Sequence, residues 1–173
     1  RQIENLIAYQ IGALLGITLT EGCILTHVKP HGALNNMACK DISIANSIIR
    51  GFKAIDKNLF LLAPTNSMLI KAGLNNGIIV IEEGFADRSY MSDGSLSPRS
   101  MKGSVITDTK ETISQAMALA RGEPIQTLDG NKIVLPIKSI CIHGDNNQSL
   151  KRASLIKKEL IRNDFKLVSL TDF

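Results

Sequence analysis

A lysine and a histidine stand at a point of the chain where α/β enzymes place catalytic groups. Lys29 and His31 flank Pro30, directly after the short apolar run 23–28. Pro30 biases the residue before it towards an extended conformation, so we expect a strand to end here and Gly32 to turn the chain into a helix. A lysine can bind an anionic group, and an imidazole can carry a proton near neutral pH. The residues alone also allow a plain surface turn in which His31 caps the next helix.

Charged side chains also follow the third apolar run of the chain, 77–81. Asp87 and Arg88 come soon after this predicted strand, and Arg99 lies in the long Gly- and Ser-rich segment 82–107. Long irregular segments of compact domains are usually functional lids or disordered. The planar guanidinium of Arg99 suits a carboxylate, so Arg99 is a candidate substrate clamp. The alternative is a solvated loop whose ion pairs contribute little to stability.

His143 follows a further predicted strand, 139–142, and Asp145 comes two residues later. An aspartate just before a helix is an ordinary N-cap, which is the simplest interpretation of Asp145. His143 occupies the same kind of position as His31, so both imidazoles could face one cavity at the carboxyl ends of parallel strands. A His/Asp group also resembles part of a divalent-metal site, but the sequence has neither a His-Glu-x-x-His motif nor a cysteine pair with zinc spacing.

Short apolar runs alternate with helical patterns, which is typical of an α/β fold with a parallel sheet. The predicted helices cover residues 3–15, 36–54, 68–72, 110–121 and 147–163. The predicted strands cover residues 23–29, 58–63, 77–81 and 139–142, with a further short strand at 166–169. Asp129-Gly130 favours a two-residue hairpin turn between the runs 125–128 and 131–135. The sequence contains no repeat or linker and therefore predicts a single domain, 1–173.

Two further expectations concern burial. The spacing in the last predicted helix points these side chains inward: Leu150, Ala153, Ile156, Leu160 and Ile161. Cys23 and Cys141 fall inside apolar runs, so we expect buried free thiols, which fit a reducing cytoplasm.

The composition is that of an ordinary globular protein and excludes some function classes. Of 173 residues, 44% are hydrophobic and 21% are charged, and the net charge is +4. The basic residues are scattered and aromatic residues make up only 4%, so nucleic acid is not an expected partner. No apolar run approaches the ~18 residues of a membrane span, so we expect no membrane partner either.

Three motifs resemble, in order, signatures of the LamB/YcsF family, whose members are also known as the A subunit of 5-oxoprolinase. They are Val28–Leu34, Glu83–Arg88 with Asp93–Ser100, and Cys141–Asp145. The likeness begins near Tyr9 and covers essentially the whole chain. Two departures are visible, because Asn35 stands where family members usually have tyrosine and Gly84 stands where a bulkier residue is usual.

The resemblance implies a seven-stranded, TIM-barrel-like parallel (β/α) barrel of the glycoside hydrolase/deacetylase type. Such barrels typically need about 250 residues. The Asp-rich, His-Ala-Gly-Asp and His-Pro segments that begin family members do not occur here. We therefore expect an incomplete barrel, a C-terminal portion that lacks the first three strands. Its strand at 23–29 would have an unpaired edge, and the fragment alone would be inactive.

The resemblance also implies an activity, the ATP-dependent hydrolysis of 5-oxo-L-proline to L-glutamate together with subunits B and C. The implied catalytic residues are Lys29, His31, Asp87 and His143. The implied substrate-binding residues are Arg88, Arg99, Asn36 and Asp145. The cofactors would be ATP and Mg²⁺, with Glu82 or Glu83 as a base or magnesium ligand. The sequence has no Gly-x-x-x-x-Gly-Lys-[Ser/Thr] loop, so ATP would need an unusual site, a missing segment or a partner subunit.

Two alternatives stay open. Fold relationship alone suggests a metal-dependent carbohydrate deacetylase-like enzyme. An inactive truncated remnant or interaction subunit would keep the motifs without the rest of the barrel.

Overall fold

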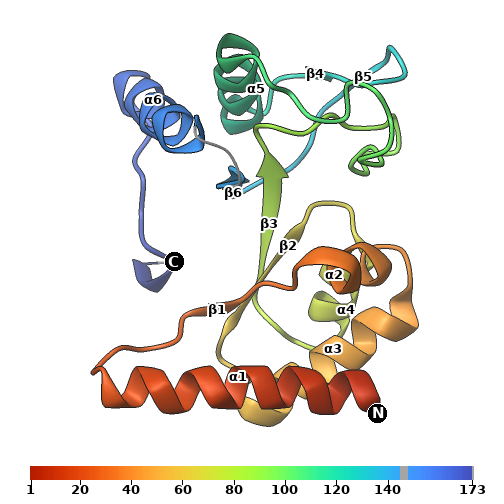
Figure 1. Cartoon of the computed structure of the whole chain (residues 1–173), viewed down its shortest axis with the longest axis vertical. Coiled ribbons are helices and arrows are strands. Elements are labelled where there is room, and N and C mark those ends of the chain that lie inside the picture. The colour runs from red at the N-terminus through yellow and green to blue at the C-terminus, as the bar shows by residue number, and fades with distance from the viewer. Residues whose placement is uncertain (145–147, 173) are drawn as a thin grey trace. The chain divides into compact units, whose positions relative to one another are not determined.

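The computed structural model describes residues 1–144 and 148–172, which divide into two compact units (Figure 1). The first unit comprises residues 1–81 and the C-terminal residues from Leu170, and the second comprises residues 82–169. Each unit combines helices with parallel strand pairing, so the α/β class is confirmed. The boundary between the units falls within strand β3 (Val80–Phe85), which begins in the first unit and continues in the second. That the chain forms a single domain stays a prediction.

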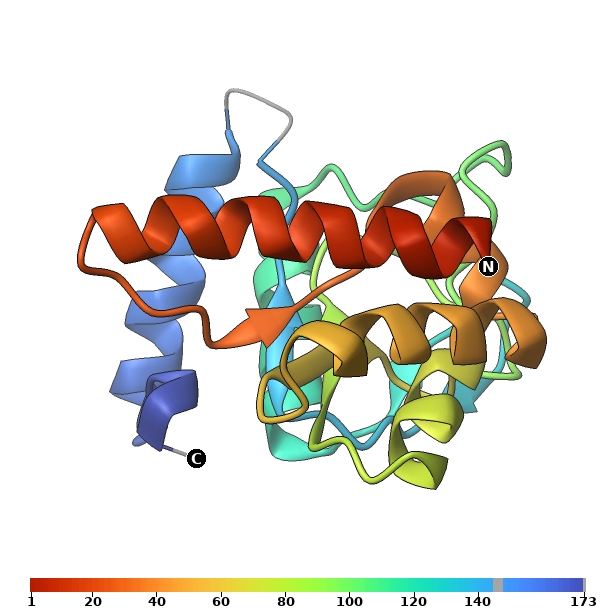
Figure 2. The same ribbon diagram turned by 90° about the horizontal axis from the view of Figure 1, so that it is seen from below.

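Two helices pack side by side in the first unit, as Figures 1 and 2 show. Helix α1 (Gln2–Thr20) extends the predicted helix 3–15 at its C-terminal end, and it buries Ile7 and Ile11 against α3 (Ile42–Ile55). Gly51 of α3 permits the close approach, because a Cβ atom there would lie 2.5 Å from the carbonyl oxygen of Glu4. This contact is therefore held at a distance that only glycine allows.

The predicted helix 36–54 is wrong as a single element. The chain forms α2 (Gly32–Ala38) and then α3, with a break at Asp41. The Asp41 carboxylate accepts hydrogen bonds from the backbone N–H groups of Ser43 at 2.7 Å and Ile44 at 3.3 Å. A side chain that satisfies these N–H groups begins a new helix, which the apolar spacing alone does not reveal.

The strands of the first unit are parallel but unequal in length. Strand β1 (His27–Val28) is much shorter than the predicted strand 23–29, and Cys23, expected to be buried in it, is exposed. Strand β2 (Phe60–Pro64) pairs with β1 through His27 and Phe60, and it confirms the prediction for 58–63 with a small shift. Helix α4 (Met68–Asn75) confirms the predicted helix 68–72 and extends it by three residues, and the Ser67 side chain caps its N-terminus.

The second unit pairs β3 in parallel with β6 (Ser139–Cys141). Strand β3 starts three residues later than the run 77–81 suggests, because Gly77 adopts a φ of 69° and Ile78 still donates to Gly73 at the end of α4. Helices α5 (Thr109–Arg121) and α6 (Ser149–Arg162) pack together, with Ala116, Met117, Ile156 and Leu160 in a shared core.

The hairpin of strands β4 (Ile125–Gln126) and β5 (Lys132–Ile133) is present, but its turn differs from the prediction. The N–H of Thr127 donates to the carbonyl of Asn131, so the loop has three residues rather than two. Gly130 has a φ of 91°, whereas Asp129 has no positive φ as a primed two-residue turn would require. The prediction of a turn at Asp129-Gly130 is therefore correct, but the predicted type of turn is wrong.

The inward face of α6 also differs from the prediction. Ile156 and Leu160 are buried as expected, but Leu150 is 83% exposed and Ile161 is 54% exposed. Arg152 is buried instead, and its guanidinium donates to the carbonyl of Thr107. The buried residues at 152, 156 and 160 are four positions apart and lie on one face of the helix. A prediction based only on apolar residues misses this face because one of the three is an arginine.

Two smaller expectations fail. Residues 166–169 form no strand, and the short 3-10 helix η1 (Leu170–Asp172) follows them. Helix α1 is long and apolar enough to cross a membrane by length and composition alone, so the expectation that no run approaches that size is wrong. A buried core helix and a signal sequence meet the same criterion. Ile7 and Ile11 of α1 pack on α3, but only 11% of its apolar stretch is buried.

Candidate active site

Asp87 and His143 lie in direct contact just beyond the carboxyl ends of β3 and β6. Nδ1 of His143 is 2.9 Å from Oδ1 and 3.0 Å from Oδ2 of Asp87, and the backbone N–H of His143 donates to Oδ2 at 2.9 Å. The strand register explains the contact, since Phe85 pairs with Cys141 and the two site residues each follow two positions later. Asp87 and His143, two of the predicted catalytic residues, are therefore in contact, and their catalytic role stays a prediction.

The two side chains differ in their access to solvent. The Asp87 side chain is 6% exposed and the His143 side chain is 26% exposed, so a solute can reach the imidazole but not the carboxylate. Burial by itself raises the pKa of Asp87, but hydrogen bonds and charge attraction from His143 outweigh it and hold the pKa below its usual value. Asp87 is therefore ionised at neutral pH.

This ionisation fixes the tautomer of the neutral imidazole. A carboxylate can only accept hydrogen bonds, so Nδ1 of His143 must carry the hydrogen that Asp87 accepts. The lone pair of the neutral ring then lies on Nε2. The pair can thus present a proton acceptor at Nε2 and stabilise the imidazolium that forms when a proton arrives.

The imidazole also stacks on an aromatic ring of β3. The ring centroids of Phe85 and His143 are 5.7 Å apart with an interplanar angle of 24°. The backbone N–H of Phe85 donates to the phenol oxygen of Tyr90 at 2.7 Å, and burial raises the pKa of that phenol. A buried tyrosine therefore binds the backbone at the point where β3 ends.

Arg88 holds the long loop that follows β3. Its Nε donates to the carbonyl of Ser104 at 3.0 Å and its Nη2 donates to the carbonyl of Ser97 at 2.6 Å. The side chain is buried, and burial lowers its pKa. These contacts order the loop, so Arg88 serves here as an anchor, and its predicted contact with substrate stays a prediction.

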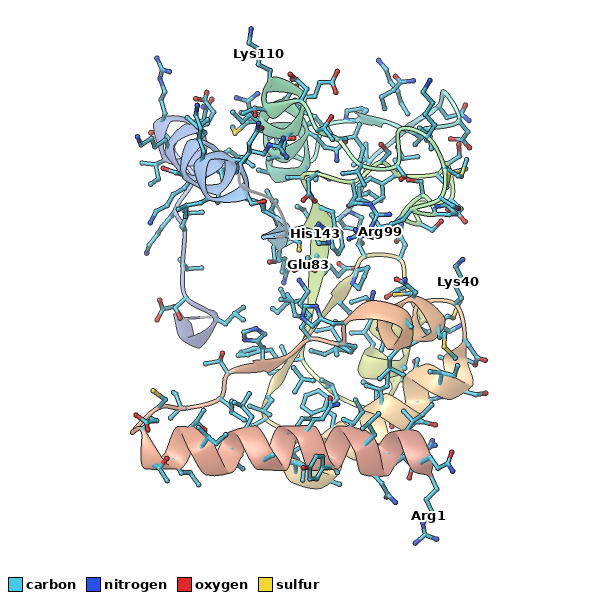
Figure 3. The ribbon with its side chains drawn as sticks, viewed as in Figure 1. Arg1, Lys40, Glu83, Arg99, Lys110 and His143 are labelled. Atoms are coloured by element: carbon cyan, nitrogen blue, oxygen red, sulfur yellow. The ribbon has the colours of Figure 1, made fainter. Side chains whose placement is uncertain are left out.

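Two further charged residues of the second unit, Arg99 and Glu83, are labelled with His143 in Figure 3. Arg99 lies close enough to Arg88 for its charge to lower the pKa of Arg88 further. Glu83, on β3, is only 2% exposed, and its charge acts on Tyr90. The clamp role of Arg99 and the base or magnesium-ligand role of Glu83 stay predictions.

Three of the other predicted residues belong to the first unit. Lys29 is half-buried after β1, and Asn36 is exposed on α2. His31 is exposed at the N-cap position of α2, but its ring makes no capping hydrogen bond with a described residue, so the simple capping interpretation fails. The prediction that Lys29 and His31 share one rim with Asp87 and His143 stays a prediction.

Asp145, predicted to bind substrate or cap a helix, lies outside the described residues. Among residues 1–144 and 148–172, no group of three or more His, Cys, Asp or Glu side chains is placed to hold a metal ion.

The sequence interpretation missed Gln115, on α5. Its side-chain Nε2 donates to the carbonyls of Phe85 at 2.8 Å and Arg88 at 2.7 Å, on both sides of Asp87. A polar residue within an amphipathic helix has no distinctive spacing, so only the fold reveals this contact.

Comparisons with known proteins find relatives that align with most of this chain. The chain is 41% identical over 170 residues to the A subunit of 5-oxoprolinase from Coprothermobacter proteolyticus, an alignment that covers 98% of this chain and 65% of that protein. It is 37% identical over 169 residues to the A subunit of 5-oxoprolinase from Methylococcus capsulatus, with the same coverage. It resembles the crystal structure of the lactam utilization protein from Thermus thermophilus with a TM-score of 0.88 and 33% identity, over 95% of this chain and 66% of that one.

The chain thus spans about two thirds of the length of these relatives. The LamB/YcsF family model matches residues 1–173. This chain belongs to the LamB/YcsF family.

Proposed function

We propose that this chain is part of the A subunit of a 5-oxoprolinase that hydrolyses 5-oxo-L-proline to L-glutamate, coupled to ATP hydrolysis, together with subunits B and C. The names of the relatives support the substrate, since they are 5-oxoprolinases, and their naming as one subunit supports an assembly. The contact between Asp87 and His143 carries the chemical part of the proposal, because it supplies an oriented proton acceptor.

Opening a lactam needs such a group. Water attacks the ring carbonyl, the bond between the carbonyl carbon and the ring nitrogen breaks, and the nitrogen leaves as the amine of glutamate. Nε2 of His143 accepts a proton from the attacking water and returns it to the departing nitrogen. Asp87 keeps Nδ1 protonated and stabilises the imidazolium between these two transfers.

The remaining predicted residues take supporting roles in the proposal. Arg99 would pair with the carboxylate of 5-oxoproline, because a guanidinium binds a carboxylate with two parallel hydrogen bonds. Lys29 and His31 are included because their motif resembles that of the family. Lys29 would stabilise a developing oxyanion, and His31 would be a second proton carrier. Asn36, Arg88 and Asp145 are kept as candidate substrate contacts on the same ground.

ATP and Mg²⁺ are part of the proposal as implications of the family. The described residues do not fit them by themselves, because these residues contain no cluster able to hold a metal and the sequence has no phosphate-binding Gly-rich loop. The complete TIM-barrel-like fold and a cytoplasmic location belong to the proposal as implications of the same kind, as does the absence of nucleic-acid and membrane partners.

The direct test is glutamate release from 5-oxo-L-proline by the full-length protein containing this chain, assembled with its partner subunits and supplied with ATP and Mg²⁺. His143→Gln should lower the rate by about 10²- to 10⁴-fold, because the proton acceptor is lost. Lys110→Ala is the matched control, since Lys110 projects from α5 into solvent (Figure 3) and should leave the rate unchanged.

The outcomes separate the alternatives. No glutamate from the wild-type assembly would contradict the proposed substrate. Glutamate release at a normal rate by His143→Gln would contradict the role of His143 while leaving the substrate in place. Release of acetate from an acetylated sugar instead would favour the deacetylase alternative.

A further inference from the structure

We propose that Gln115 is a positioning residue that holds two contacts of the His143 imidazole in place, its stacking on Phe85 and its hydrogen bond to Asp87. The inference rests on the proposed function only in the part that concerns turnover. Its structural part concerns the tautomer of His143 and can be tested without a substrate.

The geometry of the Gln115 amide is the first step. Nε2 lies 2.8 Å from the carbonyl oxygen of Phe85, 2.7 Å from that of Arg88 and 3.4 Å from that of Ala86. An amide nitrogen carries two hydrogens, so the two short contacts use both of them. Gln115 therefore fastens the two ends of the segment Phe85–Arg88 to helix α5.

The segment Phe85–Arg88 contains the two residues, Phe85 and Asp87, that contact the imidazole. The Phe85 ring stacks on His143 at its first residue, and the Asp87 carboxylate accepts the Nδ1 hydrogen at its third. One side chain outside the segment thus controls two contacts that must be correct together. A shift of the segment would move the ring and the carboxylate at the same time.

Other hydrogen bonds of the segment engage different atoms. Tyr90 binds the N–H of Phe85, the Cys141 carbonyl binds the N–H of Ala86, and the N–H of Ile106 binds the Asp87 carbonyl. Gln115 binds the carbonyls of Phe85 and Arg88, two residues that are buried. Removing its amide therefore takes a donor from buried carbonyls that have little access to water, which costs free energy and favours a shift of the segment.

The helix that carries Gln115 is itself well fixed. Asp108 caps α5 by accepting the N–H of Glu111 at 2.9 Å, and Thr112 donates its hydroxyl to the Asp108 carbonyl at 2.7 Å. The opposite end stops at Gly122, whose φ is 65°. A side chain on such a helix can define a position for the more irregular segment after β3.

The chemical consequence concerns the site of the lone pair on the ring. When the carboxylate moves away, Nδ1 loses the acceptor that selects the Nδ1–H form. The ring then populates the Nε2–H tautomer, which presents no proton acceptor at Nε2. Loss of Gln115 should therefore lower turnover through the tautomer of His143 and leave substrate binding largely intact.

The test compares Gln115→Met with the wild-type chain by ¹⁵N NMR of the imidazole nitrogens. The chain has three histidines, and His143→Gln identifies the signals of His143. At a pH where titration of these signals shows the ring to be neutral, the wild-type chain should show a protonated Nδ1 and an unprotonated Nε2 for His143. Methionine keeps the length of the side chain and removes both donors, so Gln115→Met should show a mixture of tautomers. Ser114→Ala, an exposed neighbour on α5, should leave the signals unchanged.

A kinetic measurement on the full-length assembly completes the test. Gln115→Met should lower kcat by about 10- to 100-fold with KM unchanged, as expected for a small displacement of a catalytic group. If Gln115 only stabilises the fold, the variant will unfold at a lower temperature but will keep the wild-type tautomer and kcat. That result would overturn the inference.

A milder variant and the independent readout keep the outcomes distinct. Should Gln115→Met fail to fold, Gln115→Asn retains the amide but is one methylene too short to reach both carbonyls, and it should show the same tautomer mixture to a smaller degree. A changed tautomer with no 5-oxoproline turnover even in the wild type would contradict the proposed function and leave this inference standing. Turnover by the wild type, with an unchanged tautomer and kcat in the variants, would support the proposed function and contradict the inference about Gln115.

Discussion

Nδ1 of His143 lies 2.9 Å from Oδ1 of Asp87, although 56 positions separate the two residues in the chain. The parallel register of β3 and β6 creates this contact, because it aligns Phe85 with Cys141 and so aligns the residues that follow. The relationship gives the candidate site its chemistry, and the following predictions depend on it or on the packing that supports it.

Asp87→Asn should destabilise the protein at neutral pH and weaken the pH dependence of stability. The folded pKa of Asp87 is depressed, so its contribution is fully present above the unfolded pKa of about 3.9 and is lost as the pH falls through the lower folded pKa. Urea unfolding at pH 7 should show a loss of about 1–3 kcal/mol, because a buried charged hydrogen bond is removed. Near pH 3 the difference between variant and wild type should shrink.

Glu111→Gln is the control for that experiment, because Glu111 is exposed. Its stability should change little at either pH. A constant difference between Asp87→Asn and wild type from pH 7 to pH 3 would show that the Asp87 charge contributes nothing to folding.

Arg88→Gln should loosen the loop 89–106. The substitution removes the charged donors to the carbonyls of Ser97 and Ser104, each of which contributes about 1.5–3 kcal/mol. A protease should then cut the variant within 89–106 at least about 10-fold faster than the wild type. The far-UV CD spectrum should be unchanged. Arg162→Gln, on the exposed side of α6, should not alter the cleavage rate, and equal rates for both variants would refute the anchor role of Arg88.

Gly51→Ala should separate α1 from α3. The added Cβ would lie 2.5 Å from the Glu4 carbonyl oxygen, so backbone must move, and overpacking of this kind costs about 1–3 kcal/mol. Gly12→Ala on the facing helix is the matched variant, because its Cβ would meet Ile55 at an ordinary 3.9 Å. Alanine has the higher helix propensity, so Gly12→Ala should stabilise by about 0.5–1 kcal/mol. Thermal unfolding of both variants decides this, and a stable Gly51→Ala would show that the helices pack otherwise.

Lys29→Ala and His31→Ala should each lower glutamate release by the full-length assembly by about 10²-fold, if their motif match reflects catalysis. His31 is exposed and Lys29 is half-buried, so the unfolding temperature should change little for His31→Ala and should fall only modestly for Lys29→Ala. Near-normal rates for both variants would make the pair structural and remove them from the site.

The sequence allowed the α/β class and the order of most elements to be predicted. Asp87 and His143 were both candidate catalytic residues, but their direct contact was not predicted. Residue types at the carboxyl ends of strands are a local signal, and parallel pairing makes them converge. The break at Asp41 and the late start of β3 could not be predicted from apolar spacing, because a capping carboxylate and a glycine with positive φ set those boundaries.

The support around the site could not be predicted from the sequence either. Tyr90, Gln115 and Arg88 act through backbone atoms of other segments, and such contacts leave no periodic pattern. The burial of Arg152 was missed for the same reason, since its partner is a backbone carbonyl.

The central claim is that Asp87 and His143 act as one proton-transfer unit in lactam hydrolysis. Its most direct test is the rate of glutamate release by the full-length assembly for Asp87→Asn, His143→Gln and the double variant. Groups that act as a unit are strongly non-additive, so the double variant should be no slower than His143→Gln alone, at about 10²- to 10⁴-fold below wild type. Multiplying effects in the double variant, or a His143→Gln rate near that of wild type, would contradict the account.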